Sequence, residues 1–220
     1  MAPAGAAPPR RIIWDLGVRA FHWLVVALIV AAWWSYRSDL MVWHRRIGYA
    51  IAAMLAFRVF WGFVGSAPAR FSNFVRSPAD VARYLRGRIP GGVGHNPAGG
   101  WSVLALLATL AVLVVTGLLG VTQEGDSGRI ASGVPFDWSR TATHLHALAF
   151  DALLALVGLH LVAVLIHQLL GHDLVRPMFS GRKRLEADVE GPTLPPPWPG
   201  LMGAALALVA YIALAVVDGG

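Results

Sequence analysis

The chain has 220 residues, of which 56% are hydrophobic and only 14% are charged. Soluble domains carry about 25% charged residues, so this composition and the mean hydropathy of +0.60 indicate a protein embedded in lipid. The absence of cysteine excludes disulfides, Cys-ligated zinc, iron–sulfur clusters and covalently attached c-type haem. The net charge of +6 comes from arginines that lie between apolar stretches rather than on one basic face, which argues against a nucleic-acid partner.

Five apolar stretches are long enough to cross roughly 30 Å of hydrocarbon as helices. In chain order they cover approximately residues 18–34, 44–64, 101–121, 144–170 and 201–217. We therefore expect an all-α integral membrane protein with a four-helix transmembrane bundle. The predicted organisation is a disordered N-terminus at 1–11, the bundle domain at 12–184, a proline-rich linker at 185–200 and a fifth transmembrane helix at 201–217.

Basic residues gather in three segments that would share one side of the membrane. These are the N-terminus, with Arg10 and Arg11, the segment 65–96 with five arginines against Asp80, and the segment after residue 170. Cytoplasmic loops carry an excess of Lys and Arg. The pattern predicts a multi-pass protein with a cytoplasmic N-terminus.

Four histidines lie in or at the ends of the predicted spans. Ionisable groups at such depth are costly and are functional candidates by default. His146 and His160 are 14 residues apart on one helix, which is roughly 21 Å along the axis and nearly the same face. His44 is expected level with His146 near the outer surface, and His22 level with His160 near the inner surface. Each pair could hold a planar cofactor between helices.

Two opposed imidazoles suit six-coordinate haem iron, which has no open position for oxygen and works in electron transfer. Zinc prefers four convergent ligands, so two b-type haems are the expected cofactors. Gly48, one turn after His44, would let a porphyrin lie close to its helix. Arg58, 14 residues after His44, either binds a haem propionate or extends to the cytoplasmic surface. Arg19, Arg45 and Arg46 are further propionate candidates.

Other histidines compete for these roles. His167 lies one heptad beyond His160 on roughly the same face and is the alternative ligand, although its depth places it in the inner interface. His144 points away from the face of His146, and His172 is expected in solvent. His95 is expected to be a solvated loop residue beside Asn96, which is predicted to cap the third span, with Pro97 at its first position.

An ordered set of short motifs resembles the bacterial cytochrome b561 family, which includes the cytochrome b subunits of nickel–iron hydrogenases. The matching stretches are 14–23, 44–49, 57–65, 69–72, 94–100 and 180–184, together with the histidines of the fourth span. Each motif alone is weak, and the order makes the set specific. The usual family member ends near residue 183, so the linker and fifth span are a departure that could form a docking surface.

The resemblance implies a four-helix bundle with two haem b groups ligated by His22, His44, His146 and His160. It also implies electron exchange in the bacterial inner membrane between the quinone pool and a partner such as a cytochrome c, a hydrogenase or a dehydrogenase. One alternative is a stand-alone quinone-coupled oxidoreductase that draws a small anion to Arg45 and Arg46. Another is a non-redox transporter with a histidine proton relay, for which Asp151 is the one clear intramembrane acid.

Overall fold

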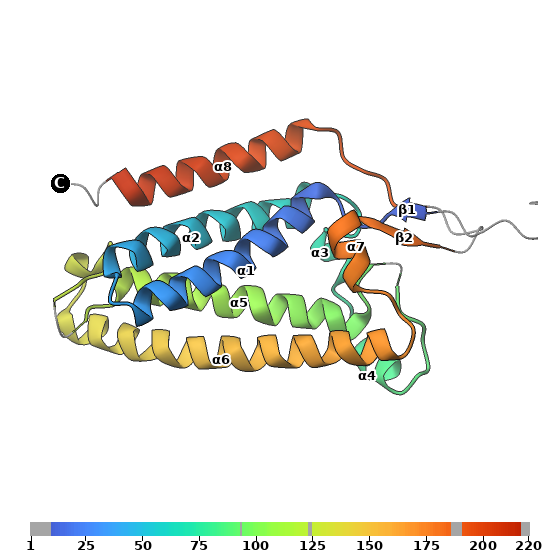
Figure 1. Cartoon of the computed structure of the whole chain (residues 1–220), viewed down its shortest axis with the longest axis horizontal. Helices are drawn as coiled ribbons and strands as arrows, with labels where there is room; N and C mark the ends of the chain where they lie inside the picture. The colour runs from blue at the N-terminus through green and yellow to red at the C-terminus, as the bar shows by residue number, and fades with distance from the viewer. Residues whose placement is uncertain (1–9, 93, 123–124, 186–190, 217–220) are drawn as a thin grey trace, which may run out of the picture.

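Four long helices run side by side as a bundle, and a fifth lies along one of them (Figure 1). In the computed structural model they are α1 (Leu16–Arg37), α2 (Met41–Val64), α5 (Pro97–Leu119), α6 (Phe136–Leu169) and α8 (Trp198–Ala215). The structure describes residues 10–92, 94–122, 125–185 and 191–216. All five helices are long and apolar enough to cross a membrane, so the predicted all-α membrane fold is confirmed.

The helix limits follow the apolar stretches to within four residues, except at the start of the fourth span. The fourth span begins at Phe136, eight residues before the predicted start at 144. Its first turns contain Asp137, Ser139 and Arg140, which a search for apolar residues passes over. The fifth span begins at Trp198 rather than 201, because a proline is well tolerated in the first turn of a helix.

The short elements gather at one end of the bundle, which we call the basic end. They are α3 (Phe71–Phe74), α4 (Pro78–Leu85), α7 (Val175–Ser180), β1 (Arg10–Ile12) and β2 (Arg182–Arg184). The opposite end holds the turn between α1 and α2 and the short helix η1 (Ala131–Gly133). The three basic segments of the sequence therefore lie at the same end, as predicted.

The strands β1 and β2 form an antiparallel ribbon in which Arg10 lies opposite Arg184. Arg10 and Arg11 thus belong to a strand rather than to the predicted disordered terminus, of which residues 1–9 lie outside the described residues. The ribbon is anchored by Ile13, whose backbone N–H donates to the Gly181 carbonyl at 2.8 Å and whose side chain is 1% exposed.

Asp15 fixes the start of α1 against the end of α2. Its carboxylate caps α1 by accepting from the Val18 backbone N–H at 2.8 Å, and it also accepts from the Trp61 indole N–H and the Ser66 hydroxyl. Asn96 caps α5 in the same manner, accepting from the Gly99 N–H at 2.7 Å. The predicted cap is confirmed, and both helices begin at defined depths.

The centre of the bundle is an apolar cluster to which all four helices contribute. Its buried members are Val25, Ile51, Leu110, Leu113, Ala149 and Leu153. Leu153 is 2% exposed and lies seven residues from both His146 and His160. The core therefore separates the two depths at which the candidate histidines lie.

The fifth helix packs along α2 (Figure 1). At Gly203 an added Cβ would lie 2.9 Å from the Phe57 ring and 3.2 Å from the Phe60 ring. The glycine therefore permits close approach of the two helices. Helix α8 therefore covers the side of α2 that carries Phe57 and Phe60.

Candidate haem sites

His44 on α2 and His146 on α6 face each other near the end opposite the basic end. Their ring centres are 6.1 Å apart, and the ring planes are inclined at 79°. Both residues are half-buried. The first predicted pair is thus brought together across the two halves of the bundle.

Hydrogen bonds fix which nitrogen of each ring is free. The Nδ1 of His44 lies 2.9 Å from the Ala32 carbonyl on α1, and the Nδ1 of His146 lies 2.9 Å from the Leu113 carbonyl on α5. A carbonyl oxygen only accepts, so both Nδ1 atoms carry the proton. The lone pair of each Nε2 remains, which is the tautomer that binds a metal.

The spacing and the donor type fit haem iron. Two imidazole nitrogens at about 2 Å from a common metal place their ring centres roughly 6 Å apart, close to the 6.1 Å observed. Within the described chain, no three or more metal-binding side chains gather, whereas zinc sites use four ligands. The residues present therefore suit a group that brings its own equatorial ligands.

Two glycines shape the surroundings of this pair. A Cβ added at Gly117 on α5 would lie 3.1 Å from Cε1 and 3.3 Å from Nδ1 of His146, so the glycine lets that ring pack against α5. A Cβ added at Gly48 would meet no protein atom within 4 Å. Protein packing does not demand glycine at position 48, while a flat group lying beside α2 would.

His22 on α1 and His160 on α6 lie nearer the basic end. Both are half-buried and close enough to each other to interact electrostatically. The ring of His22 packs edge-on against Trp23 at 4.7 Å, and its buried Nδ1 has no hydrogen-bond partner among the described residues. The second predicted pair is therefore within electrostatic range, with an unsatisfied polar atom that the protein alone does not account for.

Arg58 is buried toward the basic end, where it and His160 both lie within electrostatic range of His95. Its side chain is 3% exposed, so it does not extend to the surface, and its guanidinium lies over the rings of Phe71 at 5.1 Å and Phe74 at 6.0 Å. Asp15 is within electrostatic range but is occupied by α1 and Trp61. The Nη1 of Arg58 has no partner within the described part of the chain. A buried guanidinium with an unpaired N–H group can bind an additional carboxylate.

The other propionate candidates have protein partners. Arg19 donates to the Phe179 carbonyl, Arg45 forms a 2.9 Å salt bridge with Asp126, and Arg46 lies over the Trp43 ring at 5.6 Å. These contacts give partners to three arginines that the sequence left open, although the buried Nε of Arg19 has no hydrogen-bond partner among the described residues. They also tie Arg45 to a carboxylate, which weakens the case for attraction of a small anion there.

His167 is engaged by hydrogen bonds through both ring nitrogens. Its Nδ1 lies 2.8 Å from the Ala163 carbonyl and therefore donates, so Nε2 accepts, with the Tyr84 hydroxyl at 3.2 Å and the Asn96 amide at 3.4 Å. The lone pair that a metal would need is occupied. This favours His160 over His167 as the ligand. His144 and His172 are exposed, as expected.

His95 departs from the sequence-based expectation of a solvated loop residue. Its ring is packed between Trp14 and Phe74, each with ring centres 4.7 Å away. Burial, reinforced by the nearby charge of Arg58, lowers the pKa of His95 to about 4. It also lines a cavity of about 550 Å³ at the basic end, together with Asn73, Phe74 and Asp80. The motif of His95, Asn96 and Pro97 suggested a cap, but the enclosing rings come from positions 21 residues or more away in the chain.

Comparison with known families decides the identity of the bundle. The family described as prokaryotic cytochrome b561 matches residues 13–181. The chain belongs to the prokaryotic cytochrome b561 family. Among curated proteins, no sequence shows significant similarity to it.

Membership of this family confirms the resemblance that the ordered motifs indicated. It also identifies the class of protein and its cofactor. This b561 chain is a multi-pass membrane protein and a b-type cytochrome of electron transfer that binds haem b. The match ends at residue 181, before the linker and α8, so the fifth helix lies outside the family region. A non-redox transporter is not the function that this family indicates, and Asp151 is exposed on α6.

Proposed function

We propose that this b561 chain is a dihaem cytochrome with two bis-histidine sites. His44 and His146 would hold one haem b, and His22 and His160 the other. The observation that carries the proposal is the first pair, whose ring centres are 6.1 Å apart while both Nδ1 atoms donate to backbone carbonyls. Rings held in this way present Nε2 toward a shared metal.

The surrounding residues would orient and retain the two groups. The carbonyls of Ala32 and Leu113 hold the ring orientations of the first pair, and Thr116 adds a contact to His146 at 3.2 Å. At the second pair, Arg58 would bind a propionate through Nη1. The apolar cluster between the pairs excludes water from the interior.

Bound haem iron would supply one-electron oxidation and reduction at each site. Because His146 and His160 are 14 residues apart on the unbroken helix α6, the sites lie at depths that differ by roughly 21 Å. We infer that electrons pass between the membrane quinone pool and a redox partner, such as a cytochrome c, a hydrogenase or a dehydrogenase. The basic end would face the cytoplasm of the bacterial inner membrane.

Single replacement of each proposed ligand tests the pairing. His44→Ala and His146→Ala should each remove the same haem, with one haem retained per chain and the same reduced-minus-oxidised spectrum. His22→Ala and His160→Ala should each remove the haem of the second pair and retain the haem held by His44 and His146. His144→Ala is the matched control and should keep the wild-type spectrum. Loss of different haems from the two members of a pair would contradict the assignment.

A further inference from the structure

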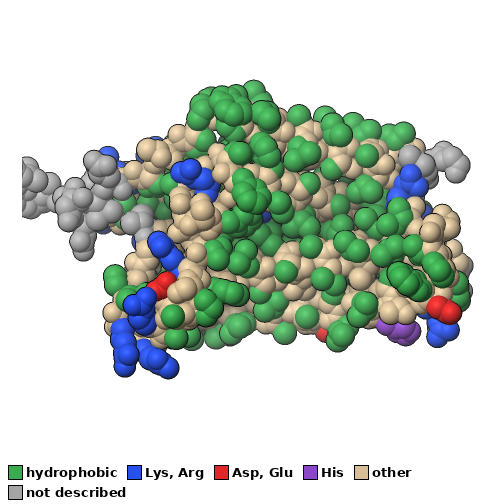
Figure 2. Space-filling model, turned by 180° about the vertical axis from the view of Figure 1, so that it is seen from behind, with side chains coloured by type: hydrophobic (Ala, Val, Ile, Leu, Met, Phe, Trp, Pro, Cys, Tyr) green, Lys and Arg blue, Asp and Glu red, His purple; other side chains and the backbone are tan. Residues whose placement is uncertain are grey.

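Helix α4 and the residues on either side of it hold a concentration of exposed arginines at the basic end. Figure 2 shows a group of basic side chains over this part of the molecule, beside hydrophobic ones. The exposed arginines of the segment are Arg76, Arg83, Arg86 and Arg88, and Leu85 between them is 71% exposed. Along α4, Asp80 and Arg83 are three residues apart and share one side, while Val81 and Leu85 are four residues apart and share another. Cationic and apolar side chains on opposite sides are typical of a helix lying in a membrane interface.

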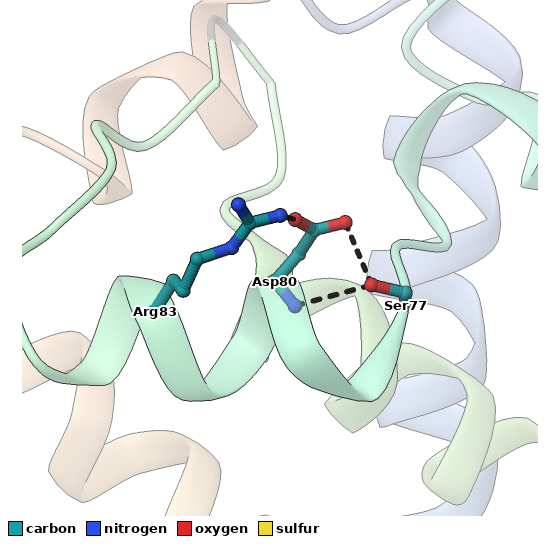
Figure 3. A network of polar contacts seen from close by, with 3 residues as sticks. All are labelled: Ser77, Asp80 and Arg83. Atoms are coloured by element: carbon teal, nitrogen blue, oxygen red, sulfur yellow. Dashed lines mark hydrogen bonds and ion pairs between the residues drawn. The ribbon is translucent and has the colours of Figure 1, made fainter.

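Asp80, the one acidic residue of this segment, already has hydrogen-bonding and ion-pair partners. Asp80 accepts from the hydroxyl of Ser77 and pairs with Arg83 (Figure 3). The hydrogen bond from Ser77, followed by the contact with Arg83, lowers the pKa of Asp80. Within the described residues, Arg76, Arg86 and Arg88 have no carboxylate partner. The segment therefore presents uncompensated positive charge.

The turn after α4 fixes two of these arginines. Gly87 has φ 67°, a left-handed conformation that ends the helix. Its N–H donates to the Tyr84 carbonyl at 2.9 Å, and the N–H of Arg88 donates to the Arg83 carbonyl at 2.9 Å. Arg86 and Arg88 thus flank a hydrogen-bonded turn, which keeps their backbone positions close together.

Contacts to the long helices place α4 at the depth where the spans end. The Tyr84 hydroxyl bonds to His167 in the last turn of α6, where Leu169 is 78% exposed. The indole N–H of Trp101, in the first turns of α5, donates to the Arg76 carbonyl at 2.9 Å. Tryptophan is enriched at membrane–water interfaces. The arginines therefore lie beside a lipid-facing apolar surface and at headgroup level.

We propose that α4 and the following turn form a binding site for an anionic phospholipid. The lipid phosphate lies between the guanidinium groups of Arg86 and Arg88, and its acyl chains run along Leu85 and the ends of α5 and α6. The charge, the fixed turn and the adjoining apolar surface each match one part of such a lipid. The site does not depend on the number of haems.

Native mass spectrometry of the full-length haem-loaded protein tests the site, with phosphatidylglycerol and phosphatidylcholine at equal concentrations. The wild type should retain phosphatidylglycerol preferentially. An arginine near an anionic lipid surface contributes enough that each Arg→Gln change should weaken binding about fivefold, or about 30-fold for the Arg86→Gln, Arg88→Gln pair. The control pair is Arg37→Gln, Arg140→Gln, two exposed arginines at the opposite end, which should bind like the wild type.

Equal retention of the two lipids by the wild type would overturn the proposal, whatever the variants do. Equal weakening by the Arg86→Gln, Arg88→Gln pair and by the control pair would also overturn it, because the effect would then come from general charge. The haem spectrum of each variant reports folding, and the single variants Arg86→Gln and Arg88→Gln replace the pair if its spectrum is altered.

Discussion

Arg58 offers a sharp test of whether a haem carboxylate completes the site at the basic end. The side chain is 3% exposed, its Nη1 lacks a partner among the described residues, and Asp15 is occupied by other donors. If Arg58 binds a propionate, then Arg58→Met removes a charge-assisted hydrogen bond worth about 1.5–3 kcal/mol. That loss corresponds to haem binding about 10- to 150-fold weaker at one of the two sites.

The assay is transfer of haem from the detergent-purified cytochrome to excess apomyoglobin, followed by the visible spectrum. Arg58→Met should release one haem faster and leave the other unchanged. Arg37→Met, at the exposed end of α1, is the control. Removal of a buried charge without a partner is often neutral or stabilising. Unchanged haem release together with a raised unfolding midpoint would therefore refute the reasoning.

Three further predictions concern side chains around the sites. Gly117→Val should displace the His146 ring, 3.1 Å from the added Cβ, and weaken retention of the first haem by about 10- to 100-fold in the same transfer assay, whereas an unchanged rate would contradict the packing. His167→Gln should keep both haems by haem quantification, because Nε2 is occupied by Tyr84, and loss of one haem would make His167 a ligand. His95 has a pKa of about 4 in the folded protein and an ordinary pKa near 6.5 in the unfolded chain. The unfolded chain therefore binds the proton more readily, and the free energy of unfolding should fall by at most about 3 kcal/mol as the pH drops from 6.5 toward 4. His95→Gln should flatten this loss in unfolding midpoints measured against pH, and parallel profiles would contradict it.

The spans were predictable because each is a continuous apolar run bounded by polar or turn residues. The approach of His44 to His146 was predictable for a related reason, since the short turn between α1 and α2 makes those helices antiparallel and the helical repeat brings His146 and His160 to one face. The ordered motifs gave the family, which the match over residues 13–181 confirms. The domain limits and the ligand set remain predictions.

Other features depend on contacts that no local pattern encodes. The ribbon of β1 and β2 pairs residues about 170 positions apart in the chain. Both strands consist mostly of basic residues and show no alternation of polar and apolar positions that would have predicted a strand. His95 reads as a loop residue until Trp14 and Phe74 enclose it. The hydrogen bonds that favour His160 over His167 come from Tyr84 and Asn96, which belong to other elements. In each case the deciding partner is distant in sequence.

The most direct test of the central claim is a redox titration of the purified protein, with haem quantified per chain as the pyridine haemochrome. We expect two haem b per chain, both low-spin in the oxidised and reduced states, because two histidines would ligate each iron. One haem per chain, or a high-spin signal that binds carbon monoxide in the wild type, would contradict two bis-histidine sites.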